Sequence, residues 1–213
     1  GSGVLVTPCH VLTARHVLGV EESALAPVSR TFSISLSNRA HDGSPAAGFS
    51  VLPARLVEQG GQKGARRSAL FDDWAILELS SPIAGFAPLP LLPGNCCGAR
   101  AQRAALAGFP GDLSDPEAPE MWIDPDCAIT RKLANRIVVT DCAATSGNSG
   151  GPILVLSETG WALAAMLTRA PASPSGGPVR GADNYALPID RFLKGRIADL
   201  AASCEIRLAG PSP

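Results

Sequence analysis

The sequence predicts an all-β fold that ends in a single helix. The chain of 213 residues holds 22 glycines and 19 prolines, about one residue in five, which disfavours a helical bundle and favours many turns. Short apolar or alternating segments recur along the whole chain, and only one segment near the end has helical periodicity. These observations indicate barrels or sandwiches of short strands rather than a parallel sheet.

Strands are predicted where runs of apolar residues lie between turn residues. Phe32–Leu36 is the clearest, because apolar and polar residues alternate as they do along a half-buried strand. Val4–Val6 and Val11–Thr13 are two short apolar runs joined by a turn at Pro8 and Cys9. The remaining predicted strands are Phe49–Val57, Trp74–Leu79, Ala104–Phe109, Ile137–Val139, Ile153–Leu156 and Trp161–Thr168.

The predicted helix covers Asp190–Ser203. Asp190 is suited to cap its start, and the apolar residues on roughly one of its faces are Phe192, Leu193, Ile197, Leu200 and Ala201. A linker near Pro82–Gly98 divides the strands into two halves of similar size, residues 1–95 and 96–213, within one predicted domain.

Composition excludes several classes of function. Hydrophobic residues make up 46% of the chain and charged residues 17%, as in a globular protein rather than a disordered one. The net charge of -1 argues against a protein that binds nucleic acid or a membrane surface by bulk electrostatics. No apolar run in the sequence approaches the roughly 18 residues that a membrane span needs.

Six cysteines favour an oxidising compartment, secreted or periplasmic, with two or three disulfides. Six cysteines allow about 15 pairings, which the sequence alone does not separate. The chain opens on Gly1-Ser2-Gly3 and runs directly into an apolar strand without a signal peptide, so we expect it to derive from a longer precursor.

The strongest chemical signal is Thr145-Ser146-Gly147-Asn148-Ser149-Gly150-Gly151-Pro152. Ser149 lies among glycines, where a tight turn leaves its hydroxyl accessible and aims the amides of Gly147 and Ser149 at one point, as an oxyanion hole requires. A serine needs a general base and an acid that orients it. His16 ends an apolar strand and Asp73 begins another, so these two side chains are the candidates.

These three blocks resemble the chymotrypsin-like, or trypsin-like, serine endopeptidases. The histidine block of that family is resembled by Gly1-Ser2-Gly3-Val4-Leu5-Val6 together with Leu12-Thr13-Ala14-Arg15-His16-Val17. Asp73-Trp74-Ala75-Ile76-Leu77 resembles its aspartate block, and Gly147-Asn148-Ser149-Gly150-Gly151-Pro152 its serine block. The chain order His, Asp, Ser is also the order of that fold, unlike the order in α/β-hydrolases. Between the blocks, only the rhythm of strands and the final helix match.

The resemblance implies two six-stranded antiparallel β-barrels with a C-terminal helix. Because the Gly-Ser-Gly block opens the chain, either the chain is a fragment or the first barrel lacks its first strand. It makes Ser149 the nucleophile, His16 the general base and Asp73 the group that orients His16, with oxyanion amides at Gly147 and Ser149. The expected reaction is peptide-bond hydrolysis through an acyl-enzyme, without a cofactor or metal, on protein or peptide substrates and by a monomer.

Alternatives stay open at several positions. Asp72 competes with Asp73, although the apolar strand begins directly after Asp73. His10 and His41 lie outside the blocks and are interpreted as structural or surface residues. A zinc site that uses Cys9, His10 and either Cys96 or Cys97 fits by ligand type but matches no spacing pattern. A catalytically silent binding module and an esterase on the same scaffold are the rival functions.

Two departures from the family narrow the interpretation. Asn148 stands where the animal digestive enzymes carry an aspartate that pairs with a new N-terminal ammonium, so that route of activation is not expected and a bacterial branch is favoured. The base of the specificity pocket falls on Ala143 and Ala144, and its far wall on Met166, Leu167 and Thr168. None of these is charged, which predicts an uncharged residue before the scissile bond.

The family resemblance also suggests how the cysteines pair. A bond between Cys127 and Cys142 is expected on the approach to the serine block. Cys96 and Cys97 are adjacent and are not expected to bond each other, so one of them is expected to pair with Cys9 or Cys204.

Overall fold

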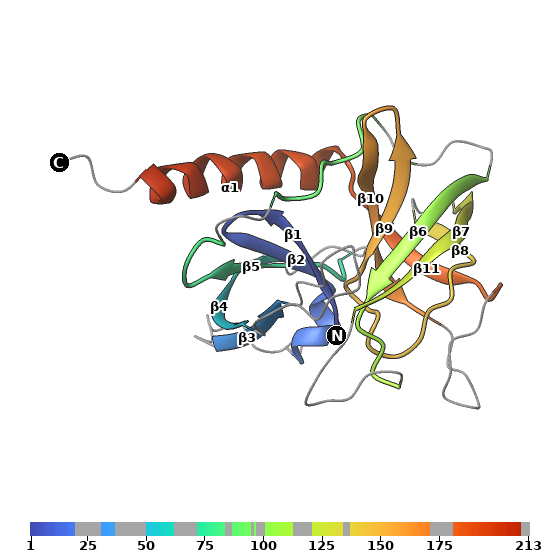
Figure 1. Ribbon diagram of the computed structural model, residues 1–213, viewed down its shortest axis with the longest axis horizontal. Coiled ribbons are helices and arrows are strands. Elements are labelled where there is room, and N and C mark those ends of the chain that lie inside the picture. The colour runs from blue at the N-terminus through green and yellow to red at the C-terminus, as the bar shows by residue number, and fades with distance from the viewer. Residues whose placement is uncertain are drawn as a thin grey trace.

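The computed structural model describes residues 1–19, 31–36, 50–61, 72–83, 87–94, 96, 101–112, 121–133, 137–170 and 181–209. Over these ranges the chain forms eleven β-strands, one short 3₁₀ helix and one α-helix. Figure 1 shows a sheet built from the first part of the chain beside a barrel built from the second, with the helix α1 above the sheet.

The first sheet contains five antiparallel strands in the order β1-β2-β5-β4-β3. Their bounds are β1 Gly3–Thr7, β2 His10–Thr13, β3 Thr31–Leu36, β4 Ser50–Gln59 and β5 Ala75–Leu79. Every residue of β2 is buried, because β1 and β5 flank this strand on its two edges. Thr13 pairs with Ala75, so the residues after β2 and the residues before β5 leave the sheet at the same edge.

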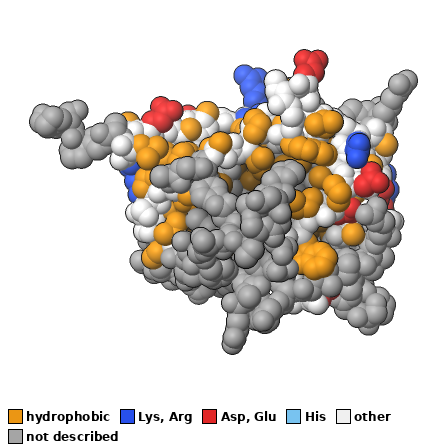
Figure 2. Space-filling view, viewed as in Figure 1, with side chains coloured by type: hydrophobic (Ala, Val, Ile, Leu, Met, Phe, Trp, Pro, Cys, Tyr) orange, Lys and Arg blue, Asp and Glu red, His pale blue; other side chains and the backbone are white. Residues whose placement is uncertain are grey.

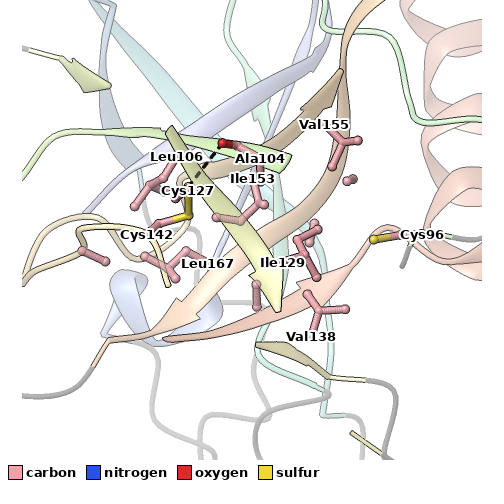
Figure 3. Packing of buried hydrophobic residues seen from close by; sticks show 14 residues of the cluster. Cys96, Ala104, Leu106, Cys127, Ile129, Val138, Cys142, Ile153, Val155 and Leu167 are labelled. Atoms are coloured by element: carbon pink, nitrogen blue, oxygen red, sulfur yellow. Dashed lines mark hydrogen bonds between the residues drawn. A yellow bond between two sulfur atoms is a disulfide. The ribbon is translucent and has the colours of Figure 1, made fainter. Parts of the chain in front are cut away.

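The second half forms a closed barrel of six strands in the order β10-β11-β8-β7-β6-β9. Their bounds are β6 Gln102–Gly108, β7 Trp122–Lys132, β8 Val138–Thr140, β9 Pro152–Ser157, β10 Gly160–Arg169 and β11 Asn184–Pro188. Alternate residues of these strands fill its interior, and Figure 3 shows Leu106, Ile129, Ile153 and Leu167 converging there beside Cys127 and Cys142.

The closed six-stranded barrel and the C-terminal helix confirm the predicted class of fold. The described part of the first half has five strands in its sheet, so its closure into a barrel stays a prediction. Two strands escape the sequence analysis. β7 carries Asp124, Pro125 and Asp126 in its middle, and β11 follows a long Pro-Ser-Gly segment, so neither has a clear strand pattern.

The helix α1 covers Arg191–Ala209 and begins as predicted, since the carboxylate of Asp190 accepts a hydrogen bond from the Leu193 amide at 3.0 Å. Leu193 and Ile197 are buried, but Phe192 is 57% exposed and does not lie on the buried face as expected. Its ring instead packs edge-on against Trp74, with 6.0 Å between ring centroids.

Three side-chain links join α1 to the first sheet. Cys204 forms a disulfide with Cys9 in the β1–β2 turn. Arg196 makes a forked ion pair with Glu58 on β4, at 2.8 and 3.0 Å, and Arg207 bonds Glu78 on β5 at 2.6 Å. The element that follows the barrel is therefore anchored on the opposite half of the molecule.

Some apolar surface stays exposed on the barrel. Leu156 and Trp161 lie opposite each other in the β9–β10 hairpin and are 55% and 36% exposed. Figure 2 shows hydrophobic side chains gathered over this part of the molecule. None of the helices in the described ranges is both long enough and apolar enough to cross a membrane.

Candidate active site

His16 and Asp73 form a hydrogen-bonded pair at the edge of the first sheet. The ring Nδ1 of His16 lies 2.7 Å from the Asp73 carboxylate, and the His16 backbone amide donates to the other carboxylate oxygen at 3.0 Å. The Asp73 side chain is 11% exposed and that of His16 is 50% exposed. A carboxylate held at Nδ1 leaves Nε2 of the neutral ring free to accept a proton.

The β2–β5 register explains how residues 57 positions apart come to meet. Thr13 and Ala75 are paired at the end of the ladder, and the chain then turns into a 3₁₀ helix over Arg15–Leu18 that carries His16. Asp73 lies two residues before Ala75, at the same edge. The partner of His16 is therefore Asp73 and not Asp72, since both hydrogen bonds go to Asp73.

Residues 145–151, called the nucleophile loop below because they hold the predicted nucleophile Ser149, connect the β8 side of the barrel to β9. Asn148 closes the loop, because its side-chain oxygen accepts the Thr145 backbone amide at 3.0 Å and its backbone amide donates to the Thr145 carbonyl at 3.2 Å. Gly147 has a φ of +99°, and a Cβ there would lie 2.5 Å from backbone atoms of Phe109 and Gly111. Only glycine fits this position without a backbone shift.

Asn148 thus has a local role in this loop. The sequence alone indicates only that Asn148 cannot form the ion pair of the animal enzymes. In the structure its amide group takes part in closing the turn, and Thr145 is further tied to Asp112 by a hydrogen bond of 2.8 Å between their side chains. These contacts hold the loop without any charged N-terminus.

Hydrogen bonds also fix two peptide planes that precede Ser149, the Ser146–Gly147 peptide and the Asn148–Ser149 peptide. The carbonyl of Ser146 accepts the Gly111 amide, and the carbonyl of Asn148 accepts the Gly151 amide, both at 2.8 Å. In a planar trans peptide the N–H points away from the C=O, so the amides of Gly147 and Ser149 are turned away from these partners. Over the described ranges, neither of those two amides has a hydrogen-bond partner.

The nucleophile loop lies against the start of the chain. Ser2 donates its amide to the Ser149 carbonyl at 2.8 Å, and its own carbonyl accepts the Thr13 hydroxyl at 2.6 Å. Gly150 has a φ of +89° and lies so close to Ser2 that a Cβ on Gly150 would be 2.1 Å from the Ser2 carbonyl oxygen. Ser149 is therefore packed beside the strand pair that leads to His16.

His16 is hydrogen-bonded directly to Asp73. Ser149 is linked to the first half of the molecule through its backbone carbonyl, which accepts the Ser2 amide. In the described part of the chain, the Ser149 hydroxyl makes no hydrogen bond to His16. Hydrogen bonds between catalytic groups are often long until substrate is bound, and they shorten in the complex with substrate.

The predicted pocket residues lie around β8, β10 and β11. Ala144 and Leu167 are buried in the barrel core, and Met166 is buried in a second cluster that includes residues of the first sheet. Thr168 is 2% exposed and donates its hydroxyl to the Tyr185 carbonyl at 3.0 Å. Ala143 is half-buried. The assignment of these residues to a substrate pocket stays a prediction.

Acidic groups near Ala143 are bound to backbone amides. Asp124 accepts the Ala143 amide at 2.7 Å, and Asp141 accepts the Ala128 amide at 2.6 Å. Both carboxylates therefore hold β7 and its neighbours together. Neither contact was visible in the sequence, because β7 was not predicted.

The cysteine pairs differ in part from the expectation. Cys127 is bonded to Cys142, with their Cα atoms 4.8 Å apart, as expected. Cys9 is bonded to Cys204, so the expected bond from Cys96 or Cys97 to one of them is wrong. The Cys9 sulfur is thus engaged in a disulfide rather than a zinc site. Cys96 is also disulfide-bonded, and Cys97 lies outside the described residues.

The second described histidine, His10, is structural, as predicted. It is 1% exposed, and its Nδ1 lies 2.7 Å from the Thr7 hydroxyl in the β1–β2 turn. Desolvation by burial lowers the pKa of His10, against the opposing effect of Glu78 and with smaller contributions from Arg207 and Arg55. His41 lies outside the described residues.

Sequence reasoning missed the role of Ser2. The Gly1-Ser2-Gly3 segment was recognised as part of the histidine block, but no pattern indicated which groups Ser2 binds. Its partners are Thr13, Phe109, Gly147 and Ser149, up to 147 positions away in the chain. Such contacts depend on how the two halves pack.

Comparison with known proteins indicates the family and the fold of the chain. A family model described as a trypsin-like peptidase domain matches residues 1–166. The crystal structure of the serine endoprotease from Yersinia pestis superimposes with a TM-score of 0.58 at 19% sequence identity. The match covers 95% of this chain and 57% of the other, so the chain spans little more than half the length of that protein. At this identity the likeness concerns the fold. No curated protein matches the chain.

Proposed function

Because the chain belongs to the trypsin-like peptidase domain family, we propose that it is a serine endopeptidase that uses Ser149, His16 and Asp73 as a catalytic triad. The observation that carries this proposal is the hydrogen-bonded pair of His16 and Asp73, which leaves Nε2 of the ring free. The loop that carries Ser149 packs against Ser2 and Thr13, close in the chain to His16.

In the proposed reaction, His16 Nε2 takes the proton of the Ser149 hydroxyl as Oγ bonds to the carbonyl carbon of the substrate. The protonated ring then gives this proton to the leaving amine as the C–N bond breaks, which leaves an acyl-enzyme. Water repeats the sequence with His16 as base, and it releases the acid and restores Ser149. Asp73 holds the imidazole in the required tautomer throughout.

The amides of Gly147 and Ser149 are the proposed oxyanion donors. Support comes from the peptide orientations, since the adjoining carbonyls are bound elsewhere and these two N–H groups are left without partners in the described ranges. Donors that are already oriented stabilise developing negative charge without reorganisation during the reaction.

The wider proposal concerns architecture and location. The five-stranded sheet, residues 1–95, is proposed to be the first barrel of a single two-barrel domain, and residues 96–213 its second. The disulfides support a secreted or periplasmic protein. We further propose that it belongs to the bacterial branch, as Asn148 suggests, and that it acts as a monomer on protein or peptide substrates without a cofactor.

The proposed preference before the scissile bond is an uncharged side chain. Ala143 and Ala144 offer no charge at the expected pocket base, and two neighbouring acids, Asp124 and Asp141, are bound to backbone amides. A cleavage profile on a peptide library tests this preference, and a strong preference for Arg, Lys, Asp or Glu contradicts it.

The test of the function is intact mass after incubation with a fluorophosphonate, which reacts with activated serines. We expect a single adduct on the parent protein and none on Ser149→Ala, while Ser203→Ala, a change on the exposed face of α1, leaves the adduct in place. Folded parent protein that forms no adduct overturns the proposal and favours the binding module. Adduct formation with cleavage of esters but of no protein favours the esterase.

A further inference from the structure

All the polar groups of Ser2 are hydrogen-bonded. Ser2 lies directly before β1 and is 5% exposed. Its hydroxyl donates to the Gly147 carbonyl at 2.7 Å and accepts the Phe109 amide at 2.8 Å. Its amide donates to the Ser149 carbonyl at 2.8 Å, and its carbonyl accepts the Thr13 hydroxyl at 2.6 Å. Three of these four bonds cross from the first sheet to the barrel.

From these contacts we propose that Ser2 is a positioning residue, which holds the nucleophile loop in its reactive conformation through Gly147 and Ser149. This inference rests on the proposed function. It assigns to a residue outside the triad the task of setting the directions of the two oxyanion amides.

The position of the Ser2 contact within the loop carries the argument. The peptide between Ser146 and Gly147 bears one proposed oxyanion amide, and the peptide between Asn148 and Ser149 bears the other. The Gly147–Asn148 peptide lies between them, and Ser2 Oγ binds its carbonyl. Rotation of this middle peptide changes the angle between the two flanking N–H groups, because each peptide is itself rigid.

Among the described residues, the middle peptide has one other hydrogen bond, the 3.2 Å bond from the Asn148 backbone amide to the Thr145 carbonyl within the same loop. Gly147 on its other side has no side chain to limit rotation. The 2.7 Å bond to Ser2 is therefore the contact that ties this peptide to the rest of the molecule. Loss of the hydroxyl also leaves the partly buried Phe109 amide without this acceptor.

Ser2 further links the two halves of the proposed triad. Its carbonyl binds Thr13, three residues before His16, and its amide binds the carbonyl of Ser149. One residue thus contacts both the strand that leads to the proposed base and the backbone of the proposed nucleophile. A shift of the first sheet relative to the barrel is transmitted to the loop through these bonds.

The test compares Ser2→Ala with Ser2→Thr, which keeps a hydroxyl, and with Ser157→Ala. Ser157 is the matched control, since its hydroxyl also donates to a backbone carbonyl at 2.7 Å, in the β9–β10 turn. The first readout is the second-order rate constant of fluorophosphonate labelling, below the melting temperature of each variant. We expect Ser2→Ala to slow labelling about 10- to 100-fold, less than the about 10²–10³-fold loss of kcat on removal of an oxyanion donor itself.

A purely structural role lowers the melting temperature without this loss of rate in the folded protein. The positioning role also predicts that kcat for casein hydrolysis falls while KM stays within about threefold, because the interaction matters most in the transition state. Ser2→Thr restores part of the rate. Equal labelling rates in Ser2→Ala and Ser157→Ala overturn the inference.

Amide hydrogen exchange separates this inference from the proposed function. We expect Ser2→Ala to speed exchange about tenfold or more in peptides that span residues 145–151, whereas Ser157→Ala leaves them unchanged. Parent protein without any fluorophosphonate adduct overturns the endopeptidase proposal. If amide exchange is also unchanged in Ser2→Ala, the proposed hold of Ser2 on the nucleophile loop is overturned as well. An active parent with unchanged labelling in Ser2→Ala overturns the role of Ser2 alone.

Discussion

The backbone amide and the ring Nδ1 of His16 both donate to the carboxylate of Asp73, at 3.0 and 2.7 Å. One bond fixes the position of the residue and the other fixes the ring. Together they leave a single orientation in which Nδ1 carries a proton toward Asp73 and Nε2 points away from it. The pair is thus already arranged as a general base requires, before any substrate is bound.

Asp73→Asn is expected to lower kcat by about 10³–10⁴-fold, because an amide in place of the carboxylate favours the wrong tautomer of His16. The measurement is casein hydrolysis, with far-UV circular dichroism to show that the variant is folded. Asp72→Asn is the matched control, since Asp72 makes neither of the bonds to His16. A larger loss from Asp72→Asn than from Asp73→Asn contradicts the assignment.

Gly147→Ala is expected to abolish fluorophosphonate labelling. A Cβ at this position lies 2.5 Å from backbone atoms, so the nucleophile loop has to move. Gly160→Ala is the control, because Gly160 also has a positive φ, of +115°, but nothing lies within 4 Å of its Cβ position. We expect Gly160→Ala to lower the free energy of unfolding by about 1–3 kcal/mol and to leave the labelling rate near that of the parent.

Removal of the Cys9–Cys204 disulfide is expected to destabilise the protein more than removal of the Cys127–Cys142 disulfide. The bonds join residues 195 and 15 positions apart, and the chain-entropy relation gives about 5 and about 3 kcal/mol. Guanidinium unfolding of the two double Cys→Ala variants measures the difference. All four sulfurs are buried, so the cavities left behind are comparable. Greater destabilisation from loss of Cys127–Cys142 contradicts this order.

Stability is expected to fall as the pH drops below about 6.5, the ordinary pKa of histidine, with His10 as one cause. Burial lowers the pKa of His10 in the folded protein, so the unfolded chain binds a proton that the folded chain resists. The contribution is therefore fully present above the ordinary pKa and declines below it. Melting temperatures at pH 7 and pH 5 should differ less in His10→Asn than in the parent. Equal differences in the two proteins contradict this cause.

Much of the site followed from local patterns. His16, Asp73 and Ser149 each lie at the end of an apolar strand or in a glycine-rich turn, which are features that a short stretch of sequence displays. The same holds for the N-cap at Asp190 and for most strands of the sheet and barrel. β7 was missed because charged residues and a proline interrupt it, and its pairing with β6 and β8 overrides this local preference.

The sequence by itself determined the class of fold, named His16 and Ser149 for the proposed triad, and favoured Asp73 over Asp72 as the acid between them in the chain. Only the tertiary structure decided which acid binds His16, which cysteine Cys9 meets, and that Ser2 holds the nucleophile loop. The physical reason is distance along the chain. Ser2 and Gly147 are 145 positions apart, and a hydrogen bond between them depends on how the sheet packs against the barrel, which no local pattern records.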